Sequence, residues 1–283
     1  METILCPTDF SPCSENAVWY ADEIAQRMNS RMVLFHNIYE PAGAEYISKT
    51  GEIYPYPVRD PDYEQAQQDK LEDLKNKLED NEWAMPIAYE TKIKYGMVPA
   101  NILQVAREVH ADMIVMGHEG NSGLQGILGS SIVADVIEHV SCPLMLVPES
   151  TKFRPLHRLV FATDLRGEPF TDVAFVSKLA GLFEAEILFL HILPDESAAT
   201  RQQAETELTQ MQKRMPYHRV SLYSEFNGHI EEGIGQFCQR HKADMLVMGY
   251  HPRSFWQHLF TQDYTRQMAD HTYLPLLVIH YRK

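Results

Sequence analysis

The residues best suited to bind a ligand form a glycine-rich stretch in the first half of the chain. Residues 117–123 read Gly-His-Glu-Gly-Asn-Ser-Gly with Gly120 at the centre, and Gly129, Ser130 and Ser131 precede an apolar run. Glycine lets the backbone approach a ligand closely, and the N–H groups at a helix start attract phosphate oxygens. The stretch predicts an anion site, although a turn that merely joins a strand to a helix could have the same composition.

Polar residues at the ends of apolar runs form a second candidate set. Thr8 and Asp9 follow the first run, Asn37 follows the second, and Met116 and Gly117 end another. In a doubly wound sheet, ligands bind beyond the carboxyl ends of the strands, where the strand order reverses. We therefore expect these residues to line one site together with the glycine-rich stretch.

The chain contains an internal repeat. Residues 111–117 read Ala-Asp-Met-Ile-Val-Met-Gly, and residues 243–249 repeat this phrase with leucine in place of isoleucine. Asp9 matches Asp164, which lies 155 residues later in the same kind of context. Such self-similarity over half of the chain indicates two domains of one fold.

Both halves alternate short apolar runs with stretches of helical periodicity. Strands that alternate with crossover helices imply a mostly parallel, doubly wound sheet. We predict an α/β fold of two repeated doubly wound domains, residues 1–150 and 151–283, each with a five-stranded mostly parallel sheet flanked by helices. In the first domain we expect strands at residues 4–7, 32–35, 86–93, 113–116 and 144–147.

Local signals refine this prediction. Ser11, followed by proline, is typical of a helix start. Residues 39–61 contain four tyrosines and four prolines and are expected to form a long loop. The helix after this loop is expected to bury three leucines that share one face, Leu71, Leu74 and Leu78.

These motifs resemble those of the universal stress protein family in its tandem two-domain form. In nucleotide-binding members the fingerprint is Gly-x2-Gly-x9-Gly-Ser/Thr, and the early aspartate lies near the adenine and ribose. The resemblance gives Asp9, Asn37, Gly117 and Gly120 matching positions. It also implies that the phosphates of ATP would sit over residues 130–131.

The chain departs from that pattern in two respects. Counting nine residues past Gly120 gives Ser130 where the family has glycine, and Gly129 comes one step early. No lysine or arginine occurs between Arg107 and Thr151, so this stretch offers the phosphates no cation. Backbone amides, hydroxyls and Mg²⁺ would have to bind them, and each lost charge-assisted hydrogen bond costs ~1.5–3 kcal/mol.

The second repeat has lost the glycine-rich stretch. Pro252 replaces Gly120, which removes an N–H group and restricts the backbone. Gln262 and Asp263 stand where the first repeat has its serine pair, and the carboxylate of Asp263 would repel an anion. We expect no nucleotide binding of the family's kind in the second domain.

Charge and composition exclude several classes of function. The net charge is −14, and residues 1–150 account for all of it with 24 acidic and 10 basic side chains. Phosphate backbones would repel such a surface. No apolar stretch approaches the ~20 residues of a membrane helix, and the four cysteines show no CxxC spacing. We expect a cytoplasmic protein with reduced thiols that binds neither nucleic acid nor a membrane.

The sequence contains no catalytic or metal-binding signature. The thirteen histidines form neither an HxH nor an HxxxH unit, and no Walker lysine or serine–histidine–acid pattern is present. We expect no catalytic residue and no metal site of protein ligands. His36 and His191, which follow the second strand of each repeat, are expected to serve the fold.

Three functions remain open. The first is a stress-response protein that binds ATP, with or without Mg²⁺, through its N-terminal domain. The second is a nucleotide-independent module whose output is contact with an unknown protein partner, and the third is a slow Mg²⁺-dependent ATPase. The family resemblance also implies that residues 144–147 and 276–279 pair antiparallel within one chain, and that the chain forms a homodimer.

Overall fold

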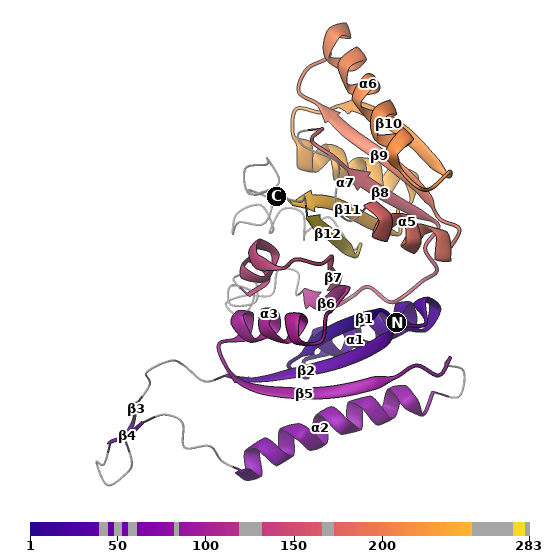
Figure 1. The fold of residues 1–283 in the computed structure, drawn as a ribbon. Coiled ribbons are helices and arrows are strands. Elements are labelled where there is room, and N and C mark those ends of the chain that lie inside the picture. The colour runs from indigo at the N-terminus through magenta and orange to yellow at the C-terminus, as the bar shows by residue number, and fades with distance from the viewer. Residues whose placement is uncertain are drawn as a thin grey trace. The chain divides into compact units, whose positions relative to one another are not determined.

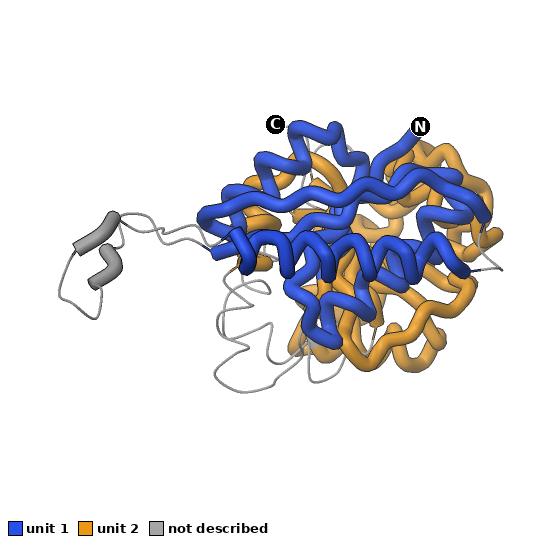
Figure 2. The backbone as a smooth tube through the Cα atoms, turned by 90° about the horizontal axis from the view of Figure 1, so that it is seen from below, with its two compact units in different colours: residues 1–116 blue, residues 117–283 orange. Residues whose placement is uncertain are grey.

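A computed structural model of the protein describes residues 1–39, 45–47, 53–55, 61–81, 85–118, 132–165, 173–250 and 274–280. The contacts within the chain group it into two compact units, residues 1–116 and residues 117–283, which Figure 2 colours separately. Both units are α/β structures with mostly parallel strands flanked by helices, which confirms the predicted fold class.

The strands of the first unit are parallel and follow the order β6-β1-β2-β5 (Figure 1). The chain passes from β1 through β2 to β5 and then returns to the other side of β1, so the strand order reverses between β1 and β6. The strands are β1 (Thr3–Thr8), β2 (Arg31–Tyr39), β5 (Tyr89–Gly96) and β6 (Met113–His118), and the helices are α1 (Pro12–Met28), α2 (Pro61–Glu79) and α3 (Val98–Glu108).

Helix α1 begins and ends where the sequence indicates. The side chain of Ser11 accepts a hydrogen bond from the N–H of Ser14 at 3.2 Å, and Pro12 occupies the first helical position. The helix ends at Asn29, whose φ of 52° is the left-handed conformation common at helix ends. One face is buried at steps of three and four residues, through Val18, Ala21, Ile24 and Ala25.

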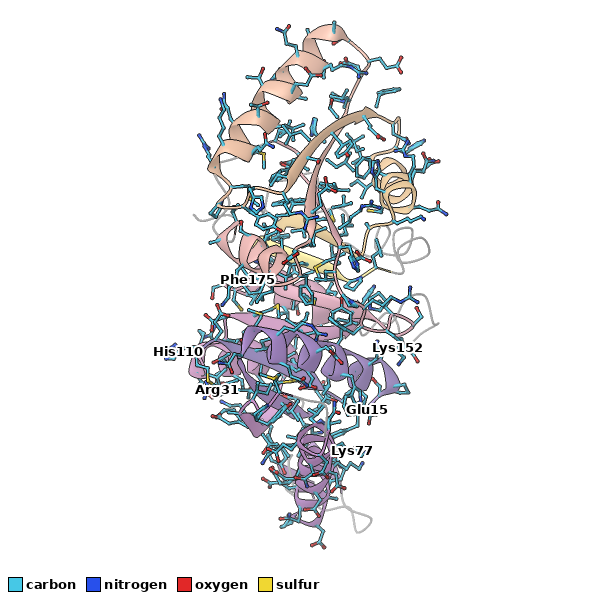
Figure 3. All side chains as sticks on the ribbon, turned by 90° about the vertical axis from the view of Figure 1, so that its right-hand side faces the viewer. Glu15, Arg31, Lys77, His110, Lys152 and Phe175 are labelled. Carbon is cyan, nitrogen blue, oxygen red and sulfur yellow. The ribbon has the colours of Figure 1, made fainter. Side chains whose placement is uncertain are left out.

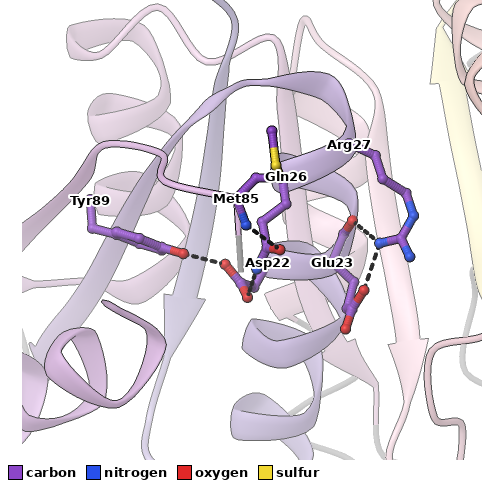
Figure 4. A network of polar contacts seen from close by, with 6 residues as sticks. All are labelled: Asp22, Glu23, Gln26, Arg27, Met85 and Tyr89. Carbon is purple, nitrogen blue, oxygen red and sulfur yellow. Dashed lines mark hydrogen bonds and ion pairs between the residues drawn. The ribbon is translucent and has the colours of Figure 1, made fainter. Parts of the chain in front are cut away.

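A buried polar network that the sequence did not suggest ties α1 to β5 (Figure 4). The carboxylate of Asp22 accepts hydrogen bonds from the hydroxyl of Tyr89 and from Nε2 of Gln26, both at 2.6 Å. Oε1 of Gln26 in turn accepts a hydrogen bond from the N–H of Met85 at 3.2 Å. Burial raises the pKa of Asp22, and these two hydrogen bonds oppose the shift.

Two predictions for the first domain need correction. Residues 86–88 are not part of a strand, because β5 begins at Tyr89 and follows β2 as far as Gly96. Within the expected loop 39–61, the structure describes a short antiparallel pair of strands, β3 (Glu45–Ile47) and β4 (Ile53–Pro55). Aromatic and β-branched residues alternate there and favour extended pairing, which the prolines and tyrosines obscured in the sequence.

In the second unit, five parallel strands follow the order β10-β9-β8-β11-β12. They are β8 (Arg158–Ala162), β9 (Glu186–Leu193), β10 (Val220–Phe226), β11 (Met245–Tyr250) and β12 (Leu276–His280). Their helices are α5 (Val173–Leu182), α6 (Ala198–Arg214) and α7 (Ile230–His241). No helix among the described residues is long and apolar enough to cross a membrane.

The last strand of the first repeat, β7 (Leu144–Pro148), pairs antiparallel with β12, with Met145 opposite Leu277. This pairing confirms the expectation for the two fifth strands and explains why β7 groups with the second unit. A hydrogen bond adds to it, because Nε2 of His280 donates to the carbonyl of Ile137 at 2.7 Å. Ile137 belongs to a helical segment at residues 132–139.

The backbone records the duplication independently of the sequence phrase. Among the described residues, three of each repeat other than glycine adopt positive φ, and each pair has the spacing of the sequence repeat: Phe10 and Leu165, Asn29 and Glu184, His110 and Lys242 (Figure 3 labels His110). The carboxylate of Asp112 accepts a hydrogen bond from the backbone N–H of Thr3 at 2.8 Å. The carboxylate of Asp244 likewise accepts one from the backbone N–H of Arg158 at 2.9 Å. The two repeats therefore share turns and strand anchors as well as sequence.

The antiparallel pairing of β7 and β12 should contribute strongly to stability. Because Leu277 is fully buried, we expect Leu277→Ala to lower the free energy of unfolding by about 2–5 kcal/mol in urea titrations. Leu182→Ala, on a leucine of α5 that is 38% exposed, is the control and should change it by less than about 0.5 kcal/mol. Equal effects of the two substitutions would contradict this account.

Candidate functional site

The turn after β1 is fixed by its own side chains. The hydroxyl oxygen Oγ1 of Thr8 accepts a hydrogen bond from the N–H of Phe10 at 3.1 Å, and Oδ1 of Asp9 accepts from the N–H of Ser11 at 3.0 Å. Phe10 is held at a φ of 63°, a conformation that bulky residues rarely adopt. The turn thus holds Thr8 in the interior and leaves Asp9 exposed at the carboxyl end of the strand.

Two serines keep Asp9 ionised. The surrounding protein partly desolvates the Asp9 carboxylate, which raises its pKa. Hydrogen bonds involving Ser11 and Ser14 outweigh this effect and hold the pKa below its usual value. Ser14 also lies within 3.0 Å of the Thr8 hydroxyl and contacts the N–H of Asp9 at 3.3 Å. An exposed carboxylate in a fixed position is a suitable acceptor for hydroxyl or amino groups of a ligand.

His36 braces this turn from the neighbouring strand. Its Nδ1 lies 2.8 Å from the carbonyl oxygen of Thr8, which can only accept, so Nδ1 carries the proton. The ring packs against Phe10 with 4.5 Å between centroids. Burial lowers the pKa of His36, which is therefore neutral at physiological pH. His191 contacts the carbonyl of Thr163 at the same distance, 2.8 Å, which supports a structural role for both histidines.

Asn37, the next residue along β2, already has protein partners. Its Nδ2 donates to the carbonyl of Gly96 at 3.0 Å, and its Oδ1 accepts from Nδ2 of Asn101 at 2.7 Å. Asn101 also donates to the carbonyl of Tyr95 at 2.9 Å. These contacts connect β2, β5 and α3 at the carboxyl edge of the sheet. The sequence predicted Asn37 but gave no signal for Asn101, which lies 64 residues away.

The remaining predicted residues lie at or beyond the end of β6. Met116 is buried, and Gly117 and the half-buried His118 complete the strand. Burial lowers the pKa of His118, which favours its neutral form. Gly120, Gly129, Ser130 and Ser131 are outside the described residues, so the structure places only the beginning of the glycine-rich stretch. It therefore places Thr8, Asp9, Asn37, Met116 and Gly117 at or near the carboxyl ends of β1, β2 and β6 and does not place the other predicted residues.

The structure adds a cation that the sequence did not reveal. Lys70, on helix α2, holds its ammonium nitrogen 5.7 Å from the ring centroid of Phe10. This places a positive charge beside the turn that carries Asp9. No motif marks Lys70, because it is one of several exposed charged residues on α2.

The corresponding edge of the second unit keeps the turn and loses polar side chains. Oγ1 of Thr163 accepts from the N–H of Leu165 at 3.1 Å, as Thr8 does from Phe10. The repeat spacing, however, places Ile192 and Gly233 where the first repeat has Asn37 and Asn101. Pro252, Gln262 and Asp263 of the degenerate loop are outside the described residues.

Metal binding and disulfide formation have no structural support in the part of the chain that is described. There, no three histidine, cysteine, aspartate or glutamate side chains gather into a group that could hold a metal ion. None of the four cysteines is in a disulfide, and three of them are buried.

A doubly wound sheet with a polar turn at its switch point defines a class of α/β domains that commonly bind ligands at that edge. The sequence model of the universal stress protein family matches residues 1–148 and again residues 155–280. The chain belongs to the universal stress protein family and contains two of its domains in tandem.

Individual relatives agree with this assignment. The chain is 27% identical over 157 residues to the universal stress protein MJ0577 of Methanocaldococcus jannaschii, a match that covers 51% of this chain and 93% of the relative. It is 31% identical over 150 residues to MJ0531 of the same organism, covering 53% and 83%.

Among solved structures, a universal stress protein from Archaeoglobus fulgidus has the same fold, with a TM-score of 0.69 and 15% identity over 99% of this chain and 96% of that one. A universal stress protein in complex with cAMP also matches, with a TM-score of 0.39 and 21% identity over 53% of this chain and 98% of that one.

The low pKa of His36 predicts a pH-dependent stability. In the unfolded state His36 takes up a proton near pH 6.5, whereas in the folded state it does so only at lower pH. The contribution of neutral His36 to the free energy of unfolding is therefore complete above about pH 6.5 and is lost as the pH falls below it. We expect His36→Asn, which can keep a donor for the Thr8 carbonyl, to reduce the loss of unfolding free energy between pH 7 and about pH 5.

The control is His139→Asn, because His139 makes a similar Nδ1 contact with the Asp135 carbonyl, at 2.9 Å, but is exposed. It should leave the wild-type pH profile of urea unfolding unchanged. Parallel profiles for the wild type and His36→Asn would show that burial of His36 does not cause the dependence.

Proposed function

We propose that the protein binds an adenine nucleotide, ATP, through its N-terminal domain. The observation that carries the proposal is the rigid turn after β1, which presents an ionised and exposed Asp9 at the switch point of the sheet. The early aspartate of nucleotide-binding universal stress proteins lies near the adenine and ribose. We take residues 1–150 as the binding domain and residues 151–283 as a domain that does not bind nucleotide.

In this proposal each polar group has a defined task. Asp9 accepts hydrogen bonds from the ribose hydroxyls or the adenine amino group, and Thr8 and Ser14 hold its position. Asn37 orders the strand ends through its bonds with Gly96 and Asn101, and its Nδ2 has a second N–H that can donate to the ligand. The backbone of Gly117 and Gly120 approaches the phosphates, and Gly129, Ser130 and Ser131 supply N–H and hydroxyl donors to ATP or MgATP.

The second repeat supports the assignment by contrast. It keeps the turn, the histidine brace and the strand anchors that the fold requires. It replaces Asn37 by Ile192 and Gly120 by Pro252, residues that cannot serve a polar ligand in the same way. One nucleotide per chain is therefore the expected stoichiometry.

A second candidate is a nucleotide-independent module that binds a protein partner. Its support is a set of exposed apolar side chains at the carboxyl edge of the first unit: Tyr39 at the end of β2, Tyr63 at the start of α2 and Met97 after β5. The slow ATPase, homodimer and cytoplasmic location expected from the sequence stay predictions.

Calorimetric titration with MgATP separates the first two candidates. We expect one site per chain in the wild type, and loss of binding in Gly120→Pro, which copies Pro252 of the second repeat. Asp9→Asn keeps the shape of the side chain and removes its charge, and it should weaken binding about tenfold.

Asp164→Asn, at the equivalent position of the second repeat, is the matched control and should leave the affinity unchanged. No heat of binding at millimolar MgATP in the wild type would reject the nucleotide site and favour the partner-binding module. A wild type that releases ADP during the titration would instead support the ATPase.

A further inference from the structure

Helix α2 carries a lysine that is not neutralised by the many acids around it. Lys75 on the same helix lies 3.4 Å from Glu72 and 3.9 Å from Glu79. Lys70 forms no ion pair with any residue of the described part of the chain, although Asp69 and Asp73 lie close to it in the helix. The ammonium group of Lys70 lies over the ring of Phe10, in the turn that carries Asp9. Since an exposed cation–π contact is weak, Lys70 can leave Phe10 for a stronger partner.

The second repeat offers a comparison for α2. Helix α6 buries two residues four positions apart, Ala204 and Leu208, and α2 buries two pairs with this spacing, Gln67 with Leu71 and Leu74 with Leu78. Alignment with the first pair places Glu207 opposite Lys70, and alignment with the second pair places Thr200 there. Neither alignment gives a lysine or arginine, and the repeat spacing places Leu165 opposite Phe10. The aromatic ring of the turn therefore occurs only in the repeat that keeps the glycine-rich stretch.

The charges around the turn are arranged for a ligand with both neutral and anionic parts. Asp9 and Lys70 act on His36 in opposite directions, Asp9 raising its pKa and Lys70 lowering it, so both charges lie near that ring. Asp9 suits the hydroxyl and amino groups of a nucleoside, which donate hydrogen bonds. An ammonium group suits phosphate oxygens, which it binds as a compact charge on a flexible stem.

We propose that Lys70 is the phosphate-binding cation of the first domain, supplied by α2 from outside the glycine-rich stretch, and that it makes the site select a nucleotide over its nucleoside. This inference rests on the proposed function. It accounts for the absence of lysine and arginine between Arg107 and Thr151, because the missing charge comes from a helix that the fold brings to the turn.

The test compares ATP with adenosine on the full-length chain. Lys70→Glu, which reverses the charge, should weaken ATP binding by about ten- to a hundredfold, the effect of losing one charge-assisted hydrogen bond. Adenosine binding should change by less than about twofold, since it has no phosphate for Lys70 to contact. Lys70→Gln, which keeps the length without the charge, should also weaken ATP binding and reduce its dependence on salt concentration.

Lys77→Glu is the matched control. Lys77 lies two turns along α2 from Lys70, about 10 Å away, and Figure 3 labels it on this exposed helix. It produces the same change in net charge and should leave both affinities within about twofold of the wild type. Circular dichroism and thermal unfolding check that all variants remain folded.

The outcomes separate this inference from the proposed function. If the wild type binds ATP and Lys70→Glu binds it as tightly as Lys77→Glu does, Lys70 is not the phosphate contact and the nucleotide site stands. An equal loss of ATP and adenosine affinity in Lys70→Glu also overturns the inference, because the lysine would then act on the nucleoside or the turn. If the wild type binds neither ligand, the proposed function fails and the role of Lys70 fails with it.

Discussion

The parallel pairing of β1 between β2 and β6 is the constraint on which the first domain depends. Backbone hydrogen bonds align Thr8 with His36 and Leu5 with Ile114, so the carboxyl ends of three strands meet at one edge. Since each strand returns through a helix, every polar residue that follows a strand is brought to that edge. Lys70, Asp9 and Asn101 come from separate parts of the chain and reach the same edge for this reason.

The duplication distinguishes residues that serve the fold from residues that serve a ligand. The histidine brace, the positive-φ turns and the aspartate anchors occur in both repeats with nearly equal distances. The polar pair Asn37–Asn101 and the contact of a lysine with an aromatic ring in the turn after the first strand occur in the first repeat alone. A second domain that conserves the framework without these groups keeps its stability, because buried strands and turns hold it together.

Electrostatics makes a local cation important in this chain. Residues 1–150 carry the whole net charge of −14, so a multiply charged anion approaches a repulsive surface. At physiological salt such long-range repulsion is screened over about 8 Å, whereas a contact at the site is not. A single lysine beside the turn can therefore decide between an anionic and a neutral ligand. Mg²⁺ would reduce the repulsion further by neutralising part of the phosphate charge.

The sequence by itself determined the fold class, the duplication, the start of α1 at Ser11 and the antiparallel pairing of the two fifth strands. The first three features follow from local chemistry, from periodic apolar patterns and from resemblance between the repeats, and the strand pairing follows from the resemblance to the universal stress protein family. It also named Thr8, Asp9 and Asn37, because residues after strands are recognisable along the chain.

Only the tertiary structure decided how those residues are used. The amide of Asn37 is occupied by Gly96 and Asn101, and Lys70 is 60 residues from its partner Phe10. The start of β5 at Tyr89 and the Asp22 network likewise depend on partners distant in sequence. No spacing rule relates such residues, since their proximity results from strand order and helix packing rather than from local propensity.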